Sequence, residues 1–168
     1  MKKDTFKLAL SLLPIQFIVS LLTFMSLPIT FAVKSNFLIF VIAVFQCIVL
    51  YSMLYIRCWQ EGWKDPNKVK LGQIEFFHFK GLVAGLLCFI PSYLLAIALF
   101  SKQLFVKLLL FIFNMNFINI NSVFPNKYYI LYIIYFLLAP LFCYLGYILG
   151  YKRISLYHKI VFIKPKNK

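Results

Sequence analysis

Long apolar runs dominate the chain, and four of them contain no Asp, Glu, Lys, Arg or His. They are residues 8–33, 36–56, 81–100 and 129–150, which hold 26, 21, 20 and 22 residues. A helix rises about 1.5 Å per residue, so about 20 residues cross a hydrocarbon core of about 30 Å. The pattern predicts an all-α membrane protein with four transmembrane helices.

The composition favours the same class. Hydrophobic residues make up 63% of the 168 residues and charged residues 13%, with a mean hydropathy of +0.88. A water-soluble domain of this composition has too few polar side chains to cover its surface. The alternative, four apolar helices buried in one small soluble interior, is therefore disfavoured.

Basic residues predict the orientation of the helices. The N-terminal tail, the second connection (residues 57–80) and the C-terminal tail hold three, five and six of the 18 Lys and Arg residues. Connections rich in Lys and Arg stay on the cytoplasmic side. We therefore expect one integral membrane domain over residues 1–168, multi-pass in the cell membrane, with both termini cytoplasmic (N-in/C-in). A fifth span over residues 104–120 would place the most basic tail outside and is disfavoured.

The basic start before an apolar run also resembles a secretory signal peptide. The run 8–33 is longer than the apolar core of such a peptide, and no clear small-x-small cleavage site follows it. We expect an uncleaved first helix.

The net charge of +14 raises the question of nucleic-acid binding. The basic residues are spread over tails and loops and do not form a patch on a folded domain, so nucleic acid is not an expected partner. Basic residues near a bilayer surface attract anionic lipids by about 1 kcal/mol each. The expected partners are the lipid bilayer and anionic lipid headgroups at the cytoplasmic face.

The residues that carry chemistry are few and scattered. Four cysteines at positions 47, 58, 88 and 143 show no CxxC spacing, and His78 and His158 have no neighbouring ligands in the sequence. The polar residues inside the spans lack a nearby base. We therefore assign no catalytic residue, no metal site and no cofactor.

The second connection, residues 57–80, is the only substantial cytoplasmic loop predicted. Trp59 and Trp63 are four apart and share one face if the second helix continues past the membrane, where they would act as interfacial anchors with Tyr151. Asp65-Pro66-Asn67 has the composition of a turn. The apolar stretch after it predicts either a short strand or an amphipathic lead-in to the third helix.

The outer connection contains a polar stripe. If residues 103–121 are helical, Gln103, Lys107, Asn114 and Asn121 lie within about 40° of one another on a wheel that advances about 100° per residue. This amphipathic segment predicts a helix in the outer interface. The alternative is a re-entrant segment whose stripe lines a cavity, as in a transporter.

Glycine and proline are placed symmetrically in the last two spans. GxxxG pairs, Gly81 with Gly85 and Gly146 with Gly150, lie near the cytoplasmic ends, and Pro91 and Pro140 lie deeper. Such pairs let helix backbones approach closely in lipid. The mirrored spacing predicts a packed hairpin in which the glycine pairs face each other and the prolines make matched kinks; the alternative is a chance register.

Two sequence runs carry a family resemblance. Residues 146–155, GYILGYKRIS, and residues 68–75, KVKLGQIE, resemble small uncharacterised four-helix integral membrane proteins of Gram-positive bacteria. The likeness lies mainly in the second half of the chain. It implies a bacterial membrane protein and no established activity.

Three functional classes follow. The chain is expected to be a non-catalytic membrane protein that packs with or stabilises a larger assembly, with a membrane protein partner or a second copy. The alternative is a component for transport or lipid translocation of an uncharged or amphipathic solute. A membrane enzyme comes third, because the polar residues of the spans lack an intramembrane base.

Overall fold

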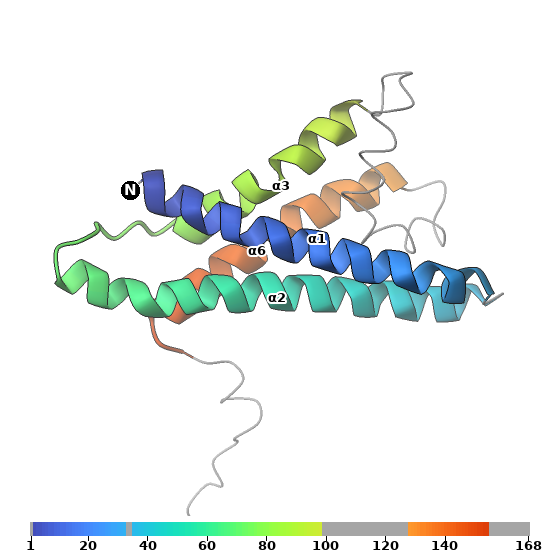
Figure 1. Ribbon diagram of the computed structural model, residues 1–168, viewed down its shortest axis with the longest axis horizontal. Helices are drawn as coiled ribbons and strands as arrows, with labels where there is room; N and C mark the ends of the chain where they lie inside the picture. Colours follow the sequence, from blue (N-terminus) through green and yellow to red (C-terminus); the bar gives the residue numbers. More distant parts are fainter. Residues whose placement is uncertain (1, 33–34, 99–127, 155–168) are drawn as a thin grey trace, which may run out of the picture.

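The computed structural model describes residues 2–32, 35–98 and 128–154, and within these ranges it is all-helical. The helices are α1 (Lys2–Ala32), α2 (Asn36–Lys70), α3 (Lys80–Ala98) and α6 (Tyr128–Tyr151) (Figure 1). The prediction of an α fold is confirmed for this part of the chain. By length and composition α1 and α2 are able to cross a membrane, whereas α3 and α6 have shorter apolar stretches, Lys80–Leu94 and Leu137–Tyr151.

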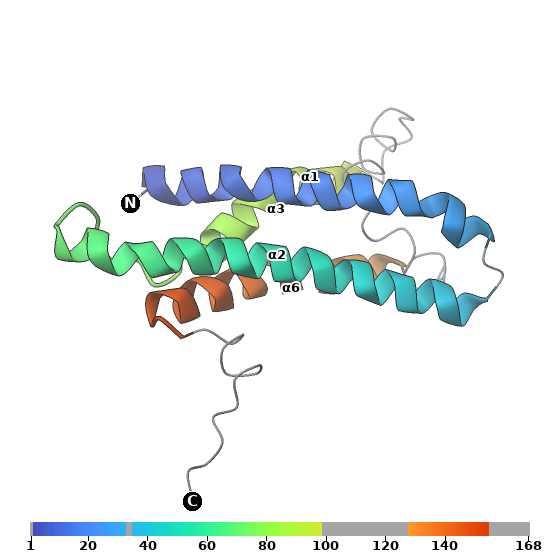
Figure 2. The same cartoon turned by 60° about the horizontal axis from the view of Figure 1, so that its bottom comes forward.

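Two long antiparallel helices organise the molecule. Helices α1 and α2 run side by side along its long axis in both views (Figures 1 and 2). Helix α6 packs mainly against α2, and α3 packs against both α6 and α1. The most extensive helix contact is therefore between α2 and α6, not within the α3–α6 hairpin that the glycine spacing favoured.

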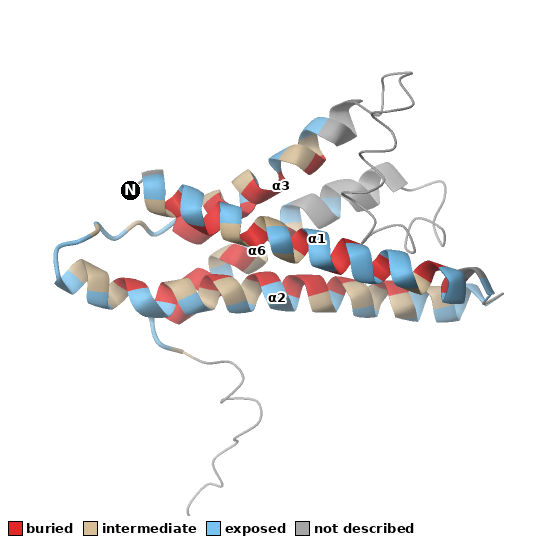
Figure 3. Cartoon of the chain, in the orientation of Figure 1, coloured by how far each residue is buried: buried red, intermediate tan, exposed pale blue. Residues whose placement is uncertain are grey.

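The burial of side chains along α1 is inverted relative to a water-soluble helix. Its outward face carries large apolar side chains such as Phe17, Ile18 and Met25, which are 55%, 49% and 68% exposed. Its polar residues are buried instead, among them Gln16 and Thr23. Figure 3 shows the two faces as alternating buried and exposed turns of the ribbon. A soluble helix places its apolar face inward and its polar face toward water.

Helix α2 is longer than the second apolar run. It continues through Asp65-Pro66-Asn67 to Lys70, so the predicted turn at Asp65 was wrong. Pro66 has no N–H for the helical bond to the carbonyl of residue 62, and such a loss normally weakens a helix. Contacts of the buried Asp65 side chain with other helices hold this stretch in helical form despite the proline.

A glycine ends α2 one turn later. The Gln73 N–H bonds the Lys68 carbonyl at 3.0 Å and the Gly72 N–H bonds the Val69 carbonyl at 3.0 Å, a Schellman motif with Gly72 at φ 67°. No strand forms in residues 71–79; the chain turns there and enters α3 at Lys80. The strand alternative for this segment is therefore wrong.

Candidate functional site

A cluster of buried charges lies where α2, α3 and α6 meet. Asp65 of α2 is completely buried. Its carboxylate accepts hydrogen bonds from Lys80 Nζ of α3 at 2.7 Å and from the Tyr147 hydroxyl of α6 at 2.9 Å. One carboxylate thus joins three helices that are distant in sequence.

Two further charges complete the cluster. Lys68 Nζ lies 2.9 Å from Glu61 Oε1 and 3.4 Å from Asp65 Oδ1, and Lys80 Nζ lies 3.8 Å from Glu61 Oε1. Two carboxylates therefore face two ammonium groups, and their formal charges cancel. Helical spacing explains the arrangement on α2, because positions 61, 65 and 68 follow the i, i+4, i+7 pattern of a single face.

The outer members of this cluster have shifted pKa values. Burial of the Glu61 carboxyl opposes its ionisation, but the Lys68 hydrogen bond and the charges of Lys68, Lys80 and Arg57 outweigh burial and lower the Glu61 pKa. Burial likewise opposes charge on Lys68, and its bonds to Glu61 and Asp65 outweigh that effect and raise the Lys68 pKa. Each shift favours the charged form that completes the cluster.

The sequence did not predict that Asp65 joins three helices. The expected turn at Asp65 removed that residue from the helix face it shares with Glu61, and the partners Lys80 and Tyr147 lie 15 and 82 residues away. The available signal was the i, i+4, i+7 spacing of Glu61, Asp65 and Lys68.

Close backbone contacts surround the buried charges. A Cβ atom on Gly62 would lie 2.2 Å from the Tyr147 carbonyl oxygen, one on Gly146 would lie 2.4 Å from that of Tyr55, and one on Gly150 would lie 2.2 Å from that of Trp59. Glycine at these positions lets α2 and α6 touch along their backbones. Gly146 and Gly150 therefore face α2, and not Gly81 and Gly85 as the mirrored spacing predicted.

The first glycine pair packs against α6 in a different register. Gly81 lies opposite Cys143 and Tyr147, and a Cβ on Gly85 would lie 2.8 Å from the Pro140 Cα. Pro140 thus faces Gly85 where the predicted hairpin placed Pro91. Both Pro91 and Pro140 lie inside continuous helices.

The three predicted interfacial anchors lie at the same end of the molecule. The rings of Trp59 and Trp63 are 5.1 Å apart, as their spacing on a continuing helix requires. Trp59 Nε1 donates a hydrogen bond to the Ile154 carbonyl at 2.9 Å, and the Tyr151 ring lies 4.2 Å from Phe76. The aromatic residues therefore fasten the end of α6 to α2 and to the segment before α3.

Polar residues inside the apolar part of the bundle bond one another. Gln16 Nε2 of α1 donates to Ser92 Oγ of α3 at 2.9 Å, and Gln46 Nε2 of α2 donates to Ser26 Oγ of α1 at 2.8 Å. These bonds tie α1 to α3 and α2, the two helices against which it packs most extensively.

The remaining predicted sites have different outcomes. Gln103, Lys107, Asn114 and Asn121 lie outside the described residues. Within the described ranges no group of three His, Cys, Asp or Glu side chains is arranged to hold a metal ion. No family model, curated protein or solved structure matches the chain.

Proposed function

We propose that this chain is a multi-pass protein of the cell membrane that crosses the bilayer four times, with both termini in the cytoplasm. The inverted α1 supports this, because large apolar side chains face outward while Gln16 and Thr23 face inward. Helices α3 and α6 have 19 and 24 residues. At about 1.5 Å per residue they reach about 28 and 36 Å, which matches a hydrocarbon core of about 30 Å.

The proposed role is non-catalytic: the protein packs with or stabilises a larger membrane assembly. The observation that carries this role is the closed charge cluster at Asp65, whose carboxylate already accepts Lys80 and Tyr147. The cavity next to Lys80 has a volume of about 10 Å³. That is about the space of one water molecule, so this cavity admits no substrate.

Topology is tested by cysteine labelling in sealed vesicles. The four native cysteines are buried, so they give little background. Lys64→Cys and Lys34→Cys should react with a membrane-impermeant maleimide from opposite sides. Reaction of both from the same side would contradict the four-span arrangement.

The assembly role is tested by isolating the full-length protein in mild detergent and identifying the proteins that elute with it. We expect one membrane protein in constant ratio, and we expect the amount of that protein in the membrane to fall when this chain is deleted. A protein that elutes alone, and whose deletion leaves other membrane proteins unchanged, would contradict this role.

A second candidate is transport or lipid translocation of an uncharged or amphipathic solute. The polar inner face of α1 favours it, since Gln16, Ser20 and Thr23 follow one another along that face. Uncharged polar side chains inside a bundle either bind helices together or line a path. Flux of a fluorescent lipid between the leaflets of reconstituted vesicles separates this candidate from a packing role.

A further inference from the structure

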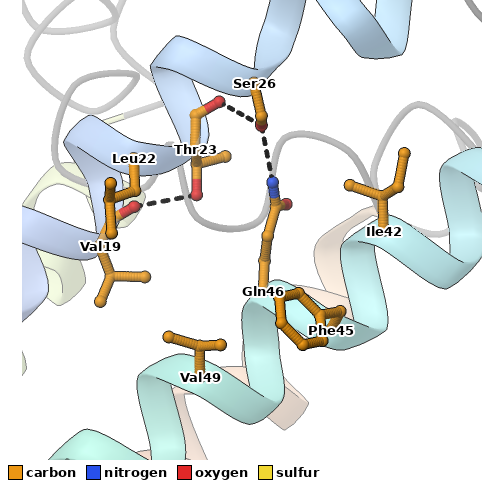
Figure 4. Close-up of a pocket in the computed structure, with 8 residues that line it drawn as sticks. All are labelled: Val19, Leu22, Thr23, Ser26, Ile42, Phe45, Gln46 and Val49. Carbon is orange, nitrogen blue, oxygen red and sulfur yellow. Dashed lines mark hydrogen bonds between the residues drawn. The ribbon is translucent and has the colours of Figure 1, made fainter.

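A groove lies between α1 and α2, away from the charge cluster (Figure 4). It has a volume of about 250 Å³, and its walls are mainly hydrocarbon, from Val19 and Leu22 of α1 and from Ile42, Phe45 and Val49 of α2. It exceeds the apolar cavity of about 150 Å³ that is known to admit a benzene molecule. We propose that this groove binds one hydrocarbon chain of a bilayer lipid.

A polar bridge crosses the groove between α1 and α2. Gln46 reaches from α2 across the gap to α1 and donates to Ser26 Oγ at 2.8 Å, and Ser26 in turn donates to the Thr23 carbonyl at 2.7 Å (Figure 4). Gln46 lies between Ile42 and Val49 along α2, so the bridge crosses the groove part-way along its length (Figure 4). By contrast, the α2–α6 interface is closed by glycines, and α1 has no glycine at all.

The depth of the groove determines what fills it. Its lining residues on α1, 19–26, and on α2, 42–49, lie 7 to 15 residues from the connection at residues 33–34. At about 1.5 Å per residue this is about 10 to 22 Å along the helices. This step rests on the proposed membrane embedding: at that depth lipid chains are the surrounding medium, and apolar walls do not retain water.

Size and shape favour a lipid chain over a protein partner. One turn of a helix, about 5.4 Å long and about 10–12 Å across with its side chains, fills about 400–600 Å³, which is more than the groove volume of about 250 Å³. A single unbranched chain lies lengthwise between α1 and α2 and contacts both walls. A lipid chain that moves from the bilayer into the groove gains no hydrophobic free energy. The favourable binding free energy therefore comes from close van der Waals packing of the chain against the lining residues.

Photo-crosslinking tests the proposal on the full-length protein. The protein is reconstituted in phosphatidylglycerol vesicles that contain some phosphatidylglycerol with a diazirine midway along one acyl chain. After irradiation, peptide mass spectrometry should place the adducts at Leu22, Ile42 and Phe45 in preference to Phe17 and Ile18, which are exposed on the outer face of α1.

Two matched variants on α2 sharpen this test. Val49→Trp fills the groove and should lower the adduct yield there about tenfold, which corresponds to about 1.4 kcal/mol of overpacking. Ile48→Trp adds the same ring at a neighbouring position that is 56% exposed, and it should leave the yield unchanged. Should Val49→Trp fail to reconstitute, Val49→Ala widens the groove and should raise the yield.

Other outcomes would overturn either the lipid-chain site or the membrane embedding on which it rests. Equal labelling of all lipid-facing residues, or groove labelling that is insensitive to both Val49 variants, would overturn the lipid-chain site. Crosslinks that join two protein copies at the groove would replace the lipid chain by a second copy and would also overturn it. Alkaline carbonate extraction, done first, separates these failures from failure of the membrane proposal, because an extractable protein contradicts membrane embedding itself.

Discussion

Lys80, the first residue of α3, lies 2.7 Å from the carboxylate of Asp65 in α2, and both side chains are closed off from the surroundings. A buried ion pair offsets its desolvation only when further hydrogen bonds satisfy both charges. Here Tyr147 and Lys68 also bond Asp65, and Glu61 lies within 3.8 Å of Lys80. The pair therefore acts as part of a closed network that sets the relative positions of three helices.

Breaking this pair should destabilise the protein strongly. Asp65→Asn leaves Lys80 buried without its main partner, and loss of one member of a buried pair costs about 3–5 kcal/mol. We expect a large fall in the unfolding temperature in mild detergent. Lys64→Met, at an exposed position on the same helix, should have little effect.

The double variant Asp65→Leu with Lys80→Leu checks the cause of that loss. Replacing both charges by apolar groups removes the unpaired charge, so it should recover part of the lost stability. Equal unfolding temperatures for Asp65→Asn and Lys64→Met would show that the buried pair does not stabilise the fold.

Substitutions at two glycines should distinguish the effect of close helix packing on stability from the effect of a left-handed backbone conformation. Gly146→Ala places a Cβ 2.4 Å from the Tyr55 carbonyl oxygen, so α2 and α6 must move apart. Gly72→Ala meets no atom within 4 Å but keeps φ at 67°, where a Cβ costs about 1 kcal/mol.

Thermal unfolding with two further variants distinguishes these effects. Gly146→Leu should be less stable than Gly146→Ala, since the clash grows with side-chain size. Gly72→Asn should recover stability relative to Gly72→Ala, since Asn tolerates this conformation. Unfolding temperatures for the Gly146 variants that equal the wild-type value would contradict the close contact of α2 and α6.

The sequence predicts some of these features and leaves others open. Runs without charged residues identify the apolar helices, and the four-residue step from Trp59 to Trp63 correctly predicts a shared face. The GxxxG spacing identifies surfaces of close approach but not the rotation of the helix, so it does not reveal that Gly146 faces α2 while Gly81 faces α6.

Local preference predicts the wrong backbone conformation at Asp65-Pro66-Asn67. These residues favour a turn in isolation. The helical form is held by the bonds of Asp65 to Lys80 and Tyr147, and such tertiary contacts are invisible to a local pattern. The same limit applies to the groove between α1 and α2, where Gln46 and Ser26 meet across two helices.

Stability should depend on pH at both ends of the range. The Glu61 pKa is lowered below its usual 4.5 in the folded state, so its contribution is present above pH 4.5 and is lost as the pH falls through the folded value. The Lys68 pKa is raised above 10.5, so its contribution is present below pH 10.5 and is lost as the pH rises through the folded value. Unfolding temperatures should thus form a plateau between about pH 5 and pH 10.

Single substitutions should remove one limb of this profile at a time. Glu61→Gln should reduce the fall in unfolding temperature below about pH 5. Lys68→Met should reduce the fall in unfolding temperature above about pH 10. An acid limb that is unchanged in Glu61→Gln would assign the acid sensitivity to another group.

Arg153, at the end of α6, has a strained left-handed backbone conformation. Two contacts of its side chain offset this strain. The Ile154 N–H bonds the Leu149 carbonyl at 2.9 Å and the Arg153 N–H bonds the Gly150 carbonyl at 2.9 Å, a Schellman motif with Arg153 at φ 55° where glycine is usual. Its guanidinium donates to Asn67 Oδ1 at 3.0 Å and lies 5.5 Å from the Trp63 ring centre.

Two substitutions at this position separate strain from contact. Arg153→Ala loses the contacts and keeps the strain, whereas Arg153→Gly loses the contacts and removes the strain. The alanine variant should therefore be less stable than the glycine variant by about 1 kcal/mol. Both should change the tryptophan emission through Trp63, while Lys152→Ala at the exposed neighbouring position should not. Equal stability of Arg153→Ala and Arg153→Gly would show that the left-handed backbone at this position carries no cost.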